Sequence, residues 1–328
     1  MSTQTFTNGE VEAVVTQYIE NAKVWDGLAI KLPLMSHMMK DGKKQQKGGT
    51  YIQVPIKLLA NTASGFISGS NAVTSINPSV QLQYMTFNWF YYNYNVNSTL
   101  AEANIATGTE QKVDFIATKV EMALQDAIRE LATALYTAQS GYSPNSILDA
   151  IATSGTAYGS LTNTNYATGA FLGVYDSSSS IPNYANVEAN KVQIEGRMAQ
   201  DMAPGDMMIL MNPKTYGKFK TSAQNQQVFS SSDLFKTGAT GFHIDGADVY
   251  MDADCPGTQD GSTGDNYIIG FPKSIAKMYY HFGFGTKSPF DGEVRMPNQP
   301  ILSDQHYMSL NFVFSNRRLM FAMKTIVA

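Results

Sequence analysis

Residues 58 to 101 contain no Asp, Glu, Lys, Arg or His, a run of 44 uncharged residues in a chain of 328. Asn, Ser, Thr and Gly interrupt the apolar residues throughout, so the run is too polar to cross a membrane. Its first part, NTASGFISGSNAVTSINPS, is rich in turn-forming residues. Its second part, VQLQYMTFNWFYYNYNVNST, is β-branched and aromatic, and this composition predicts one long strand.

Together with TYIQVPIK just before it, this run predicts a long two-stranded ribbon. An isolated two-stranded ribbon is marginally stable in water, and one without charges lacks a common protection of its edges against other chains. We therefore expect the ribbon to lie on another surface, most economically on a neighbouring copy of the same chain. The side chains expected to be buried there include Phe66, Ile67, Trp89 and Phe90.

A basic segment precedes the ribbon. In KDGKKQQKGG, from residue 40 to 49, four lysines stand against the single acidic residue Asp41, and two glycines follow. This composition predicts a solvated, flexible loop. The alternative is a hinge whose lysines face inward or contact an acidic surface of an adjoining copy. The residues concerned are Lys40, Lys43, Lys44 and Lys47.

The charge and cysteine content exclude several classes of protein. With 27 acidic and 23 basic residues, the formal net charge is −4, so the chain lacks the positive field that general nucleic-acid binding needs. The single cysteine, Cys255, excludes an internal disulfide and a cysteine-based metal cage. The first residues do not resemble a signal peptide, and no 18-residue apolar window occurs. These features predict a soluble chain made in the cytoplasm, without a membrane partner.

Hydrophobic periodicity predicts three helices. Capping-box spacings begin the first two, over residues 7–22 and 107–139, and the second would be about 45 Å long, which suits a strut. The third helix is expected over 187–202. After the apolar run MMILM, Asn212 has the position of an N-cap and Pro213 that of a first helical residue, which predicts a strand followed directly by a helix.

The remaining segments predict an α+β fold class. Residues 150 to 175 have the composition of loops and short strands. Strand-like segments then fill the C-terminal part: GFHIDGADVYM, NYIIG, SIAKMYYHFG, HYMSLNFVF and RRLMFAMKTIVA. The last two are expected to be joined tightly at Ser315-Asn316.

The sequence offers little for catalysis. None of the four histidines has the spacing of a helical zinc site, and no serine lies in a nucleophile elbow. His243 and Asp245 could share one face of a strand, but an ordinary hydrogen-bonded histidine explains the pair better than a hydrolase site does. Asp252 and Asp254 begin like a calcium loop, which Pro256 then interrupts. We expect no enzyme, no cofactor and no metal centre, and incidental cation binding at the two aspartates stays open.

Four segments, taken together with the order of the elements, carry a resemblance to a known family: PGDMMILMNPKTYGKF, GFHIDGADVYMDADCPG, DNYIIGFPKSIAKMYY and FSNRRLMFAMKTIVA. The chain resembles the major capsid protein family of tailed bacteriophages, which has the Hong Kong ninety-seven type fold. The resemblance covers essentially the whole chain. It implies five segments: an N-terminal arm over 1–48, an extended loop with its adjoining strand over 49–100, the spine helix of a peripheral domain over 101–140, an axial domain over 141–280, and returning strands of the peripheral domain over 281–328.

The resemblance also implies a function and partners. A capsid protein of this kind is made in the host cytoplasm and forms hexamers and pentamers of an icosahedral virion shell around double-stranded DNA, which it would contact weakly. A separate scaffolding protein, a portal and decoration proteins are the further partners. Some members join a lysine to an asparagine between subunits. Here the uncharged run of the ribbon, residues 58 to 101, has no lysine, and Lys57 just before it is the nearest.

Two other functions are compatible with the sequence. An encapsulin-like compartment would use the same fold to enclose a cargo enzyme instead of a genome. A β-rich hydrolase or binding protein would instead be a monomer or small oligomer with a concave site.

Overall fold

The computed structural model describes residues 32–58, 82–99, 109–151, 157–162, 172–180, 183–198, 206–224, 242–244, 246–257, 266–282, 292–295 and 301–325. They belong to two compact units. The first unit includes Phe90–Ala132 and Tyr280–Leu310, and the second includes Lys31–Trp89, Thr133–Tyr279 and Asn311–Ala328. The helix predicted over 7–22 and the contact candidates Phe66 and Ile67 lie outside the described residues.

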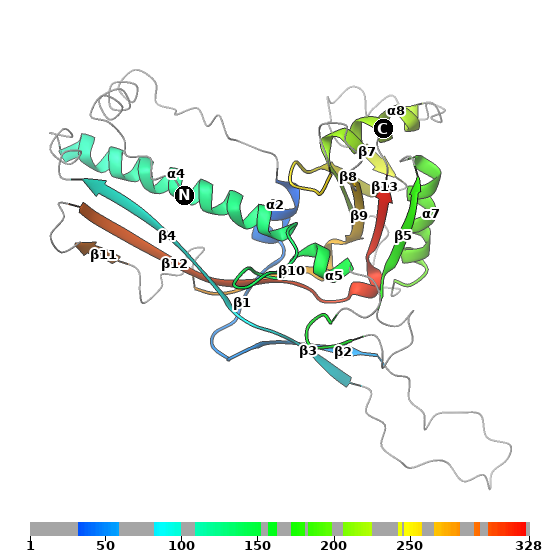
Figure 1. The fold of residues 1–328 in the computed structure, drawn as a ribbon, viewed down its shortest axis with the longest axis horizontal. Coiled ribbons are helices and arrows are strands. Elements are labelled where there is room, and N and C mark those ends of the chain that lie inside the picture. Colours follow the sequence, from blue (N-terminus) through cyan, green and yellow to red (C-terminus); the bar gives the residue numbers. More distant parts are fainter. Residues whose placement is uncertain are drawn as a thin grey trace, which may run out of the picture. The chain divides into compact units, whose positions relative to one another are not determined.

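In the first unit, a long helix runs beside antiparallel strands (Figure 1). The helix is α4, Thr109–Leu135, and the strands are β4, Phe90–Thr99, β11, Gly292–Arg295, and β12, Ile301–Phe314, of which the last four residues belong to the second unit. β12 pairs with both β4 and β11.

Two hydrogen bonds tie α4 to β4. Tyr92 donates to the Glu130 carboxylate over 2.6 Å, and Lys119 donates to the carbonyl of Asn97 over 3.3 Å. Burial and the bond to Glu130 raise the pKa of Tyr92. The helix predicted over 107–139 is therefore confirmed, although it ends at Leu135.

A six-stranded sheet forms the core of the second unit, in the order β5-β13-β9-β6-β8-β7. β6 is the central apolar strand that the sequence predicted, and all five of its residues are buried. The bounds of the strands are β5 Val174–Ser180, β6 Met207–Met211, β7 Phe242–Ile244, β8 Ala247–Met251, β9 Asn266–Pro272 and β13 Phe321–Thr325.

The helices of the second unit are α2, Pro33–Lys40, α5, Ile147–Ile151, α7, Tyr184–Glu195, and α8, Pro213–Gln224. The predicted junction of β6 and α8 is confirmed, because the Asn212 side chain accepts a hydrogen bond of 2.7 Å from the Thr215 amide. The helix predicted over 187–202 is α7, which ends earlier, at Glu195. Gly196 follows it, and glycine is a poor helix former.

A second sheet has five strands. Four of them follow the order β1-β10-β12-β11, and the fifth, β4, also pairs with β12. β10 is Ala276–Phe282 and β1 is Lys43–Gln45. The prediction of a flexible loop over the basic segment is thus wrong for β1. The amide of Met278 donates to the carbonyl of Gly42, and this pairing with β10 gives the segment a strand conformation.

The ribbon is present, but its second half was predicted incorrectly. β2, Ile52–Lys57, pairs antiparallel with β3, Leu82–Phe87. The single strand expected over 80–99 is two strands, because β3 stays with β2 whereas β4 pairs with β12. The break falls at Asn88, whose carbonyl accepts a hydrogen bond of 2.8 Å from the Asn311 side chain.

The last two strands also differ from expectation in their partners. β12 and β13 are joined closely, through a short helical turn at Arg317–Leu319, yet they belong to different sheets. The connection after Ser315 therefore passes from one sheet to the other, with the Ser315 amide bonded to the carbonyl of Ile275.

Candidate assembly surfaces

The β2–β3 ribbon has one buried face and one exposed face. Ile52, Val54, Met85 and Phe87 are buried inside the second unit, to which the ribbon belongs. The opposite side, which we call the outer ribbon face, consists of Tyr51, Gln53, Pro55 and Lys57 on one strand and Leu82, Tyr84 and Thr86 on the other. Tyr51 and Leu82 are each 49% exposed, and Tyr84 is 51% exposed. Large apolar side chains at the centre of an interface contribute most to binding, so this face is a candidate contact with another chain.

The two predicted contact residues that lie near the ribbon base have different surroundings. Trp89 donates a hydrogen bond from its indole nitrogen to the carbonyl of Gly49 over 2.9 Å. This bond links the chain entering β2 to the chain leaving β3. Phe90 is the first residue of β4 and stands opposite Leu310 in the register. Both aromatic side chains are partly exposed, so each keeps area available for a neighbour.

The four predicted lysines lie together around β1. Lys40 is the last residue of α2, Lys43 and Lys44 are on the strand, and Lys47 follows it; all but Lys43 are exposed. The ammonium group of Lys44 lies 5.4 Å from the ring centroid of Tyr279 on β10, a cation–π arrangement. The basic segment is therefore an ordered edge of a sheet that carries positive charge.

A neutral face on β4 is a further candidate. Tyr91, Asn93, Asn95 and Asn97 alternate along the strand and are exposed, Tyr91 at 70%. The even-numbered residues of β4 turn to the other side, where Tyr92 bonds to Glu130 of α4. The alternation in YYNYNVN is the sequence signal that could have located this face.

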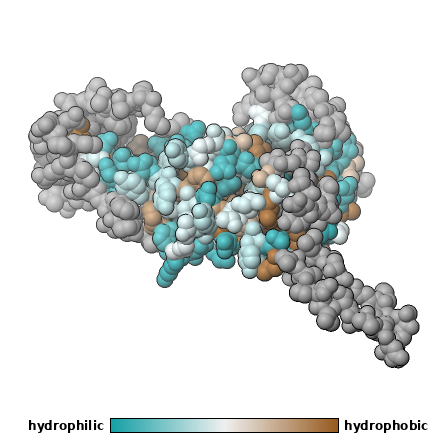
Figure 2. Space-filling view, turned by 60° about the horizontal axis from the view of Figure 1, so that its bottom comes forward, coloured by the Kyte–Doolittle hydropathy of each residue, from teal (hydrophilic) through white to brown (hydrophobic). Residues whose placement is uncertain are grey.

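On one face of the described part, the exposed apolar residues do not merge into one broad area. On the face drawn in Figure 2, brown residues form small patches among teal and white ones. Tyr142, at 94% exposure, lies on a turn closed by hydrogen bonds between Ser140 and Ser143. These features suit many small contacts better than one large interface.

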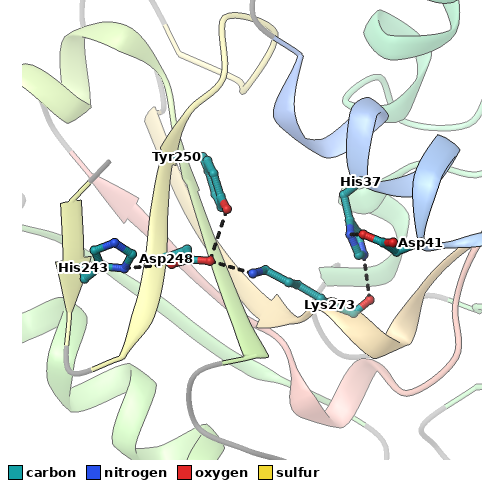
Figure 3. A network of polar contacts seen from close by, with 6 residues as sticks. All are labelled: His37, Asp41, His243, Asp248, Tyr250 and Lys273. Atoms are coloured by element: carbon teal, nitrogen blue, oxygen red, sulfur yellow. Dashed lines mark hydrogen bonds and ion pairs between the residues drawn. The ribbon is translucent and has the colours of Figure 1, made fainter. Parts of the chain in front are cut away.

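The polar network in Figure 3 has Asp248 at its centre. Its carboxylate is 2.8 Å from His243, 2.6 Å from Lys273 and 3.2 Å from the hydroxyl of Tyr250, which donates to it. Partial burial alone would raise the pKa of Asp248, but the bond and charge of Lys273 lower it overall. His37 reaches the same region through the carbonyl of Lys273, at 3.0 Å.

This network gives His243 a partner that the sequence did not indicate. His243 stands opposite Asp248 in the β7–β8 register, so the hairpin supplies its carboxylate. Asp245 lies outside the described residues. Asp248 contacts a lysine, a tyrosine and a histidine at once, and so it links β7, β8 and the turn that follows β9. None of the six residues labelled in Figure 3 is a serine or cysteine that His243 could activate.

Of the two aspartates that begin like a calcium loop, Asp252 is buried and Asp254 is partly buried. Asp252 accepts hydrogen bonds from the hydroxyl of Tyr136, at 2.8 Å, and from the amide of Asp254, at 3.1 Å. Burial raises the pKa of Asp252 and that of Tyr136. Among the described residues, no group of three or more His, Cys, Asp or Glu side chains could hold a metal ion. No helix among them is long and apolar enough to span a membrane.

No protein-family model and no curated protein matches this sequence. Solved structures do match it. The capsid of a native GTA particle has a TM-score of 0.63 at 14% identity, over 94% of this chain and 94% of that chain. The capsid of cyanophage A-1(L) has a TM-score of 0.63 at 13% identity, over 95% and 98%. The holo-SrpI encapsulin complex from Synechococcus elongatus has a TM-score of 0.55 at 8% identity, over 95% and 95%. Likeness at such low identity establishes a common fold.

Proposed function

We propose, from the premise that this chain has the α+β Hong Kong ninety-seven type fold of the capsids it matches, that it is the major capsid protein of a tailed bacteriophage. The fold predicted from the sequence is confirmed by matches that cover nearly the whole of both chains. That coverage is the observation that carries the proposal, because nearly the whole length of the chain matches the fold of shell-forming proteins.

The chain would assemble as hexamers and pentamers into an icosahedral shell around double-stranded DNA. Its role is structural and not enzymatic, consistent with aspartates that are engaged in internal bonds. A separate scaffolding protein guides assembly in the host cytoplasm, and a portal and decoration proteins complete the virion. The net charge of −4 supports weak contact with the packaged DNA.

The described elements support the division into segments that the resemblance implied. The 27-residue helix α4 suits a spine helix within 101–140. The β2–β3 ribbon suits the extended loop of 49–100, and its outer ribbon face suits contact with a neighbouring subunit. Phe66, Ile67, Trp89 and Phe90 remain the proposed apolar contacts, and the lysines around β1 the proposed polar ones.

An encapsulin-like compartment is the second candidate, favoured by the match to the SrpI complex. TM-scores do not separate the two functions, because the capsid of phage XM1 scores 0.54 and the encapsulin complex 0.55, whereas the GTA and cyanophage capsids score 0.63. Both functions require closed particles, so the contents decide between them. Nuclease-resistant DNA inside particles purified from infected cells supports the phage shell, whereas a stoichiometric cargo protein supports the compartment.

Electron microscopy and sedimentation of the purified chain test the shared requirement. We expect closed shells, formed with scaffold present if the chain alone assembles slowly. Deletion of residues 60–78, between β2 and β3, should abolish shells but leave folded subunits, because the buried strands of the second unit lie elsewhere. A wild-type chain that stays monomeric at high concentration with scaffold would overturn the proposal.

A further inference from the structure

We infer that the turn at Gly159 and Ser160 positions the β2–β3 ribbon and thereby sets the diameter of the shell. The first half of this inference concerns the subunit alone. The second half rests on the proposed function. The turn was not singled out by the sequence, which indicated only loops and short strands over 150–175.

The turn itself is tightly closed. Tyr158 and Leu161 exchange two backbone hydrogen bonds, of 2.9 and 3.2 Å. Between them, Gly159 has φ of 58° and Ser160 has φ of 65°. Two successive left-handed residues define the turn type that closes two-residue hairpins. Serine rarely adopts this conformation and keeps it only where its surroundings enforce it.

The tip of the turn contacts the ribbon directly. The amide of Thr86 on β3 donates to the carbonyl of Gly159 over 2.8 Å, and the Ser160 hydroxyl is 3.4 Å from the carbonyl of Thr86. A Cβ atom on Gly159 would lie 2.7 Å from Cβ of Met85 and 2.8 Å from Cζ of Phe87. Glycine is therefore required both by its φ and by the closeness of β3.

The residue before the tip holds the turn to the rest of the second unit. The Tyr158 ring meets Phe87 edge-on, with centroids 5.1 Å apart. Its hydroxyl accepts a hydrogen bond of 2.9 Å from the Phe314 amide at the end of β12. The guanidinium carbon of Arg317 lies 5.4 Å from the ring centroid. Contacts with Phe314 and Arg317 thus hold Tyr158 in place, and its ring in turn packs against Phe87 of the ribbon.

Two more bonds fix the base of the ribbon at its chain ends. The Asn311 amide donates to the carbonyl of Asn88, and Trp89 donates to the carbonyl of Gly49. With its base held in this way, the ribbon has a direction that is set within the subunit before any neighbour binds. A strand extends about 3.3 Å per residue, so a small rotation at the base becomes a larger displacement farther along. The angle between neighbouring subunits would change accordingly.

A matched pair of glycine substitutions tests this inference. Gly141 has the same φ of 58° as Gly159, but a Cβ there would meet nothing within 4 Å. Gly159→Ala and Gly141→Ala therefore share the backbone strain, and only the first pushes on the ribbon. For Gly159→Ala we expect amide exchange at Thr86 to be about fivefold to a hundredfold faster. We also expect shells of mixed diameter by electron microscopy. Gly141→Ala should keep the wild-type exchange rate and a single diameter.

Tyr158→Phe provides a second variant in case Gly159→Ala does not fold. It keeps the ring but removes the acceptor of the Phe314 amide, and Tyr136→Phe is its control at a buried tyrosine away from the ribbon. Unchanged exchange at Thr86 in the Gly159 and Tyr158 variants would overturn the positioning role. Faster exchange with shells of wild-type diameter would overturn the link to shell size. If the wild-type chain forms no shells, the proposed function fails, while exchange at Thr86 in the subunit still decides the first half.

Discussion

At the residue scale, several buried polar side chains of the second unit have specific hydrogen-bond partners. The Asn212 amide donates to Asn266 over 2.8 Å while its oxygen caps α8. A Cβ on Gly257 would lie only 1.6 Å from that amide nitrogen, so the pair needs glycine beside it. A buried group left without its partner costs more than the bond itself contributes, and so these pairs constrain the fold strongly.

Tyr136→Phe should be destabilising by about 1 to 3 kcal/mol at neutral pH, since the buried Asp252 carboxylate loses a donor. Burial raises the pKa of Asp252, and the Tyr136 bond partly offsets that rise. Without the bond the pKa rises further, so the cost should shrink as the pH falls and Asp252 takes up a proton. Urea unfolding of unassembled subunits at several pH values measures this. A cost independent of pH would contradict the assignment.

Asp248→Asn should lower stability by less than about 1 kcal/mol at neutral pH, because the ion pair with Lys273 is partly solvated. The folded state lowers the pKa of Asp248 overall, so its contribution is present at neutral pH and is lost as the pH falls through the folded pKa. Wild type and variant should therefore converge in acid. Thermal unfolding from pH 7 to pH 3 checks this, and a constant difference would refute it.

At the scale of elements, the choice of partner strand determines the path of the chain. β3 and β4 are separated by two residues yet enter different sheets, and β12 and β13 do the same at the other end of the chain. The Asn311 side chain spans the first of these breaks, because it donates to Asn88 and accepts from the amide of Asn145. The Asn311 side chain thus fixes the two-residue link between β3 and β4, where the chain leaves the ribbon.

Changing Lys40, Lys43, Lys44 and Lys47 together to Gln should disturb the fidelity of assembly more than the retention of DNA. The lysines lie along an ordered sheet edge and suit an acidic surface of an adjoining copy. Four lysines release few counterions, so the DNA affinity they add is weak and falls with salt. Particle yield and shape by microscopy are the readout, with nuclease-protected DNA per particle beside it. An unaltered yield of regular particles would contradict this role.

At the scale of the whole molecule, two compact units share one chain that passes between them repeatedly. The exposed contact candidates are scattered over separate elements: the outer ribbon face, the β1 lysines and the neutral face of β4. In a closed shell each contact recurs in every subunit, so weak contacts add up through multivalency. Binding of this kind also stabilises the folded subunit by mass action.

Hydrogen exchange over residues 58–101 should be slower in assembled shells than in dissociated subunits. The reason is that this uncharged run would be covered by a neighbour only after assembly. Residues 207–211, on the buried strand β6, provide the internal control, since they are protected by their own sheet in both states. Equal protection of 58–101 in both states would show that the run is not an intersubunit contact.

The sequence by itself determined those features that depend on local periodicity and on end signals. The repeat of apolar residues located α4, Asn212 and Pro213 located the start of α8, and the apolar run located β6. The absence of charge over 58–101 and the lysines near residue 40 located two candidate surfaces. All of these signals lie within one element, where neighbouring side chains share a face or a cap.

Only the tertiary structure decided which strands pair and which polar groups meet. Backbone hydrogen bonds between strands are the same for every residue, so VQLQYMTFNWFYYNYNVNST could not reveal that β3 and β4 have different partners. The pairing of His243 with Asp248 follows from the hairpin register, and the conformation of β1 follows from its neighbour β10. The turn at Gly159 depends on contacts with Thr86 and Phe314, which are distant in sequence. Such contacts arise from the packing of the folded chain, and local composition does not encode them.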